Sequence, residues 1–157
     1  SLSNYEKLLK DIINGTKKIG RKISDIDLVA NVPILITQNE NDERRKDIGR
    51  SLSIRLLLEE NTLRDLGWNG EIPEELSQSK MIIDESISKK LEEVADKIPT
   101  EITEQIAAIG RPSEIIEVLE KYKKMGAKHF LIKFLGQTTT DDLKKFNSEI
   151  IQVMKNA

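Results

Sequence analysis

Cysteine is absent from this sequence of 157 residues, and aromatic residues make up only 4% of it. The first absence excludes disulfides and thiolate metal sites, and it is compatible with a cytoplasmic location. Opposite charges nearly cancel, giving a formal net charge of -2, so the chain lacks the basic field of a nucleic-acid-binding protein. No apolar run approaches the roughly 20 residues that span a bilayer, which argues against a membrane protein.

Conventional catalytic patterns are missing as well. The sequence shows no Ser/His/Asp set, no paired metal ligands and no glycine-rich phosphate loop. The single histidine, His129, precedes an apolar run and is expected to be structural. We therefore predict no catalytic residue and no metal site. The richness in Ile, Lys and Glu leans toward a thermophile, although a biased genome would give the same composition.

The most informative stretch is IGRPSEIIEVLEKYKKMGAKHFLIKFL, residues 109–135. Pro112 suits the first position of a helix, and apolar residues then recur at helical spacing. Gly126 follows two lysines and predicts a left-handed helix end. The apolar run that comes next predicts a buried strand over about 128–135.

A second strand is expected at about 26–36, where nearly every residue is apolar. A strand apolar on both faces is typical of a parallel sheet that is covered on both sides. Pro33 conflicts with this interpretation because proline cannot donate to a ladder. Either a bulge or a gap in the neighbouring hydrogen bonding would accommodate it.

Helices are expected around these two strands. An amphipathic helix over 4–19 would cover the sheet, and its apolar stripe includes Tyr5, Leu8, Leu9, Ile12, Ile13 and Ile19. A second helix is expected over 41–60, capped by Asn39 or Asn41. A third is expected over 85–97 and begins after Asp84. A fourth is expected over 141–155, capped by Thr139 or Thr140. Residues 63–80 are expected to be a loop and 100–108 a short helix or turn.

The long separation between the two strands predicts an insertion. Roughly 90 residues separate them, whereas a crossover between parallel strands needs about a dozen. We therefore expect one domain, 1–157, with a helical insertion at 39–108. Within it, the cluster Arg44-Arg45-Lys46 is flanked by acidic residues and favours an ion-paired surface over a phosphate site. Trp68 is expected to pack on its own loop, with a ligand cleft as the alternative.

Two segments together resemble the C-terminal third of the bacterial-luciferase-like family. They are NYEKLLKDIINGTKKIGRKISDIDLVANVPILITQNENDERRKDI and IGRPSEIIEVLEKYKKMGAKHFLIKFLG. The resemblance implies the C-terminal portion of a (β/α)8 TIM-like barrel, with two parallel strands and an otherwise mostly helical chain. A full barrel takes about 250 residues, so this chain would be a fragment, or a short relative that completes its sheet by association.

The resemblance also implies a function for the parent protein. It would be a flavin- or deazaflavin-dependent oxidoreductase, either a monooxygenase or a reductase, in which FMN or a deazaflavin coenzyme carries the hydride chemistry on a small-molecule substrate. The chain alone would bind no cofactor and would be inactive or nearly so. Candidate cofactor-binding residues are Gly110 and Arg111 at a helix N-terminus, and Lys133 in the last strand. Arg111 replaces the Thr or Ser usual in the family.

Two other functions stay open. The first is a non-enzymatic helical interaction module that completes its sheet as a homo-oligomer, because unpaired strand edges invite pairing. The second is a different sugar- or phosphate-binding α/β domain, with its anion site at the helix start near Gly110.

Overall fold

The computed structural model describes residues 1–76 and 84–156. It shows a mostly helical α/β protein with one small, open sheet of three parallel strands. The chain divides into two compact units. The first unit comprises residues 1–40 and 106–157 and holds the sheet, while residues 41–105 form the second.

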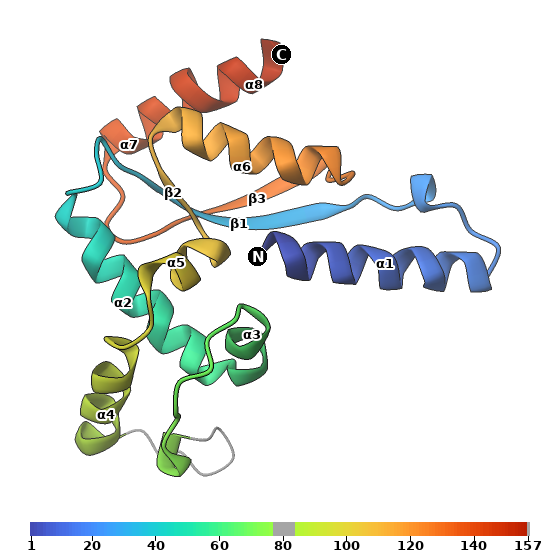
Figure 1. Cartoon of the computed structure of the whole chain (residues 1–157). Coiled ribbons are helices and arrows are strands. Elements are labelled where there is room, and N and C mark those ends of the chain that lie inside the picture. Colours follow the sequence, from blue (N-terminus) through green and yellow to red (C-terminus); the bar gives the residue numbers. More distant parts are fainter. Residues whose placement is uncertain (77–83, 157) are drawn as a thin grey trace. The chain divides into compact units, whose positions relative to one another are not determined.

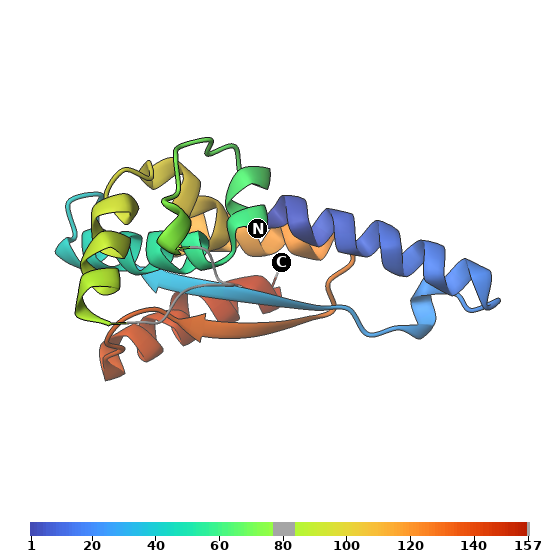
Figure 2. The same ribbon diagram turned by 90° about the horizontal axis from the view of Figure 1, so that it is seen from below.

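The sheet has the strand order β2-β1-β3. Its strands are β1 (Val29–Ile36), β2 (Ala108–Gly110) and β3 (His129–Phe134). β1 and β3 are parallel and directly paired, from Val29 opposite His129 to Ile34 opposite Phe134 (Figure 1, Figure 2). The two expected strands, their direction and their adjacency are confirmed. The third strand was not predicted, and the expectation of only a helix or turn over 100–108 was wrong at its end.

Pro33 lies in the central strand without a bulge, opposite Lys133 of β3. Its nitrogen points toward β2, because alternate residues of a parallel strand bond to opposite neighbours and Ile34 bonds to the β3 side through its carbonyl. β2 begins only opposite Ile34. Pro33 therefore lacks its N–H at a position just before the β2 ladder begins. Of the two predicted alternatives, this is the gap in the neighbouring hydrogen bonding and not the bulge.

One face of the sheet carries the core of the first unit. Ala30, Val32 and Ile34 pack there with residues of α6 (Pro112–Lys124) and with Ile150. Ile150 belongs to the C-terminal helical run, which consists of α7 (Thr140–Lys145), a π-helical segment (Phe146–Ile151) and α8 (Gln152–Asn156). Figure 1 shows α6 and α8 on the same side of the strands. This face is built from the alternate, inward-pointing residues of each strand.

β3 differs from the expectation of a buried strand. It is an edge strand, and its residues alternate between exposed and half-buried. Leu131 is 59% exposed and Val29, on the same face of β1, is 53% exposed. The apolar run correctly predicted a strand, but apolar composition did not make it an interior one.

The N-terminal helix α1 (Leu2–Lys18) packs on the core through only part of its predicted stripe. The ring of Tyr5 meets that of Tyr122 edge to face, with centroids 5.1 Å apart. Leu8, Ile12 and Ile19 are exposed instead. The predicted amphipathic helix is therefore present, but only part of its apolar stripe packs on the core.

The described part of the second unit is helical. Its elements are α2 (Glu43–Leu58), α3 (Glu60–Asp65), α4 (Glu85–Ala95) and α5 (Thr100–Thr103), with 3-10 turns at Glu74–Leu76 and Glu104–Ile106. Leu52, Leu56 and Leu57 of α2 are buried. α4 begins after Asp84, whose carboxylate accepts the Ile87 N–H, as predicted.

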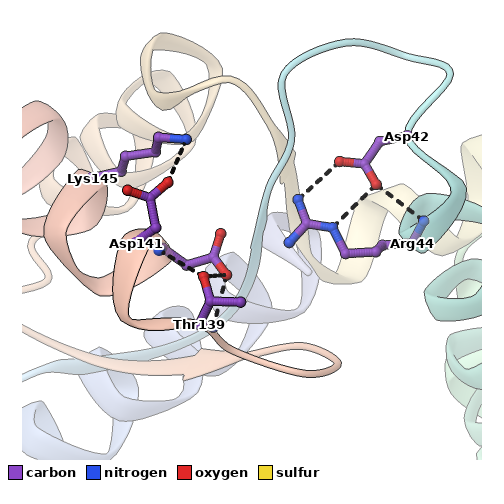
Figure 3. A network of polar contacts seen from close by, with 6 residues as sticks. Asp42, Arg44, Thr139, Asp141 and Lys145 are labelled. Atoms are coloured by element: carbon purple, nitrogen blue, oxygen red, sulfur yellow. Dashed lines mark hydrogen bonds and ion pairs between the residues drawn. The ribbon is translucent and has the colours of Figure 1, made fainter.

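The cap of α2 corrects the prediction. Asp42, rather than Asn39 or Asn41, is the N-cap, and its carboxylate accepts the backbone N–H of Arg44 at 3.1 Å (Figure 3). The Arg44 guanidinium also pairs with Asp42, at 2.9 Å, and Arg45 pairs with Glu104. The interpretation of the basic cluster as an ion-paired surface is confirmed for these two arginines.

Trp68 packs on its own segment. It is 8% exposed, the Arg64 guanidinium lies 5.5 Å from its ring centroid, and Arg64 donates to the carbonyl of Gly70 at 2.7 Å. A side chain at Gly70 would collide with the indole. The predicted loop over 63–80 is corrected at its start, where α3 extends to Asp65, and residues 77–80 lie outside the described part.

Candidate functional site

The carboxyl ends of the three parallel strands meet at one edge of the sheet. Thr37 follows β1 and donates its backbone N–H to the Gly110 carbonyl at 2.9 Å, which ties the ends of β1 and β2 together. Leu135 follows β3 and donates to the Ile34 carbonyl at 2.8 Å. Ligands of parallel α/β sheets bind at this edge, so it is the candidate site of the first unit.

Gly110 is the last residue of β2 and leads directly into α6. Its φ of +154° is one that side chains rarely adopt, and a Cβ there would lie 2.6 Å from Oε2 of Glu114. The need for glycine is thus explained by the close approach of the chain's own carboxylate. It does not by itself indicate a ligand.

Arg111 caps α6 and is bound by Glu114. The Arg111 backbone N–H donates to Glu114 Oε2 at 2.7 Å, and its guanidinium Nε lies 3.3 Å from the same oxygen. The hydrogen bond to this carboxylate, with its charge, raises the pKa of the Arg111 guanidinium. A helix N-terminus attracts anions, but here an internal anion already lies at it. A phosphate at Gly110 and Arg111 would have to displace Glu114.

Lys133, the third candidate, lies apart from the other two. It is an exposed residue of β3, opposite Pro33, whereas Gly110 lies opposite Ile36, three residues further along β1. That spacing corresponds to roughly 10 Å along the strand. The three candidates therefore do not converge on one ligand atom, and Lys133 belongs to a separate surface.

That surface is the open face of β1 and β3. It carries Val29 and Asn31 from β1 and His129, Leu131 and Lys133 from β3, all of them exposed. His129 lies at the beginning of β3, opposite Val29 and away from the carboxyl edge. This face thus combines two apolar side chains, one amide, one imidazole and one lysine, and it carries no carboxylate among these five residues.

Two tyrosines outside the site also have shifted pKa values. Burial raises the pKa of Tyr5 and of Tyr122; Tyr122 lies in the core, and the half-buried Tyr5 packs against it. Within residues 1–76 and 84–156, no three His, Cys, Asp or Glu side chains are grouped so that they could hold a metal ion. No helix in that part is long and apolar enough to cross a membrane.

No protein-family model matches the chain, and comparison with curated proteins gives no match. Sequence reasoning missed Glu114 as the group at the start of α6. The spacing of Arg111 and Glu114 contained the signal, because a Glu three residues after an N-cap reaches back to the cap's N–H.

Proposed function

We propose that this chain forms the C-terminal part of a luciferase-like (β/α)8 barrel in a flavin- or deazaflavin-dependent oxidoreductase. The observation that carries the proposal is the direct, parallel pairing of β1 with β3, although the whole stretch 37–128 lies between them in the sequence. Adjacent barrel strands have this relationship.

The two faces of the sheet support the same proposal. Helices cover the face of Ala30 and Val32, as the outer ring of a barrel would. The opposite face, with Val29 and Leu131, is open, as a lumen-facing surface would be before the remaining strands are added. Three strands cannot close a barrel, for which about eight are needed.

The cofactor phosphate does not fit the start of α6 in this arrangement. Glu114 holds that position with a negative charge, which would repel a phosphate. Lys133 on the open face is the better candidate for contact with an anionic or polar part of a cofactor. When bound, the flavin or deazaflavin would supply the hydride chemistry, and this chain would contribute part of the barrel wall.

Cofactor titration tests the proposal. FMN and a deazaflavin coenzyme would be added to the longest polypeptide translated from the gene and to the 157-residue chain, with absorbance and fluorescence followed. We expect a saturable spectral shift with the former and none with the latter. Lys133→Gln should weaken binding, whereas Lys124→Gln, an exposed change at the end of α6, should not. Absence of binding of either cofactor to the longest polypeptide would contradict the proposal.

A second candidate is a non-enzymatic interaction module, and the exposed edge strand β3 favours it. Sedimentation separates the two functions. If the longest polypeptide translated from the gene forms the same dimer as the 157-residue chain, the module is favoured. A longer polypeptide that stays monomeric favours a barrel whose own strands cover β3.

A further inference from the structure

One edge of β3 is open. Its ladder with β1 uses the odd-numbered residues. The backbone N–H of His129 donates to the carbonyl of Leu28, just before β1, at 3.3 Å, and that of Leu135 donates to the carbonyl of Ile34 at 2.8 Å. The N–H and C=O of one strand residue point to the same side, and successive residues alternate. The backbone groups of Phe130, Ile132 and Phe134 therefore point away from β1, where no strand of the described residues pairs with them.

The side chains of β3 are also incompletely covered. Phe130, Ile132 and Phe134 pack against the core but stay half-buried, and Leu131 on the other face is 59% exposed. The core-facing row of β3 is wholly apolar, whereas its other face combines Leu131 with His129 and Lys133. A neighbouring strand on this edge would cover both rows and satisfy the outward-pointing backbone groups.

We propose that this edge pairs with the same edge of a second copy of the chain, antiparallel, with Ile132 opposite Ile132. In that register the backbone groups of all three outward-pointing residues find a partner. Ile132 pairs with Ile132, and on each side of this central pair Phe130 of one copy pairs with Phe134 of the other. Charge also favours this register over its neighbours, because each Lys133 lies opposite the uncharged Leu131. Centring the pair on Lys133 would oppose two lysines, and centring it on Leu131 would place Phe134 opposite Lys128. Like charges directly opposite are destabilising.

The inference does not depend on the oxidoreductase proposal, since it concerns main-chain pairing and not cofactor binding. A strand from the remainder of a larger barrel would compete for the same edge, so the dimer is proposed for the 157-residue chain. A six-residue edge buries little area, and small interfaces are weak. The dimer should accordingly be reversible and concentration-dependent.

Analytical ultracentrifugation of charge variants provides the first test. Leu131→Glu would place a glutamate opposite Lys133 twice in each dimer, and Leu131→Lys would place a lysine there. We expect the dimer dissociation constants of these variants to differ by about tenfold or more. Val29→Glu and Val29→Lys are the matched controls, because Val29 is 53% exposed on the same face but lies on β1. The control pair should not differ in this way, and circular dichroism checks that each variant folds.

Cross-linking provides the second test, and the absence of cysteine removes any background. In the proposed register residues 131 and 133 form a non-hydrogen-bonded pair, with Cα atoms about 4.5 Å apart, which a disulfide can bridge. A mixture of Leu131→Cys and Lys133→Cys chains should therefore cross-link faster than either variant alone. A monomer at all concentrations, an undefined aggregate, equal dimerisation of the Leu131→Glu and Leu131→Lys variants, or equal cross-linking in the three samples would overturn the proposal.

Discussion

Glu114 binds Arg111 at the first turn of α6, with its Oε2 2.7 Å from the Arg111 backbone nitrogen. The carboxylate thereby satisfies a backbone N–H that the helix itself leaves free. Its negative charge also lies at the positive end of the helix dipole. This contact also explains why residue 110 is a glycine, because a Cβ at Gly110 would collide with the Glu114 carboxylate.

Gly110→Ala should destabilise the first unit by about 1–3 kcal/mol, because it combines a strained φ with a collision against Glu114. Gly15→Ala is the matched control. Gly15 lies inside α1 with nothing within 4 Å of an added Cβ, so alanine there should stabilise by about 0.5–1 kcal/mol. Urea unfolding measures the change in unfolding free energy for both variants. Changes of the same sign would contradict the conclusion that Gly110 is required by its conformation and by Glu114.

Tyr5→Phe tests the second feature, a buried hydroxyl. The Tyr5 oxygen is shielded from solvent and has no hydrogen-bond partner among the described residues. Removing it should leave stability unchanged or raise it by up to about 1 kcal/mol, since the desolvation cost disappears. Tyr5→Ala should instead cost about 2 kcal/mol, because it also deletes the edge-to-face contact with Tyr122. Thermal unfolding of the two variants distinguishes the ring from the hydroxyl.

Much of the architecture was predictable from local patterns. Pro112 and Gly126 bound α6 as expected, and the apolar runs before Thr37 and before Gly136 form the two main strands. β2 was missed because its three residues, Ala108–Gly110, are too few to show a period of their own. Its pairing with the end of β1 is a tertiary effect.

Exposure was less predictable than secondary structure. Leu8 and Leu131 sit in apolar patterns yet are exposed, because hydrophobic periodicity identifies an apolar face without identifying what covers it. The start of α6 shows the same limit of local patterns. Gly110 and Arg111 were correctly placed at a helix N-terminus, but the sequence argument did not consider that Glu114 would compete with a phosphate.

Thr139 at the start of the C-terminal helix provides a cap prediction. Its Oγ1 accepts the Asp142 N–H at 3.1 Å, while Asp142 accepts the Thr139 N–H at 2.9 Å (Figure 3). Thr139→Ala should therefore destabilise by about 1 kcal/mol, and Thr139→Ser should retain most of the stability because it keeps the oxygen. Chemical denaturation provides the comparison, and equal losses in both variants would show that the hydroxyl is not the stabilising group.

Asp42 makes a pH prediction for the second unit. Its hydrogen bond from the Arg44 side chain, more than any other cause, lowers the pKa of the Asp42 carboxyl. A lowered folded-state pKa means that the ionised form stabilises folding. This contribution is fully present above the unfolded value of about 3.9 and is lost as the pH falls through the lowered folded-state pKa.

Asp42→Asn isolates that charge, because asparagine is also a good N-cap. The variant should be less stable than the parent by about 1 kcal/mol near neutral pH, and the difference should shrink toward zero as the solution is acidified below the unfolded-state pKa. Urea denaturation at several pH values measures it. The stability difference depends on pH because Arg44 stays charged throughout, whereas the carboxyl of Asp42 becomes protonated in acid. A stability difference that stayed constant into strong acid would show that Asp42 acts through its shape as a cap, without contribution from its charge.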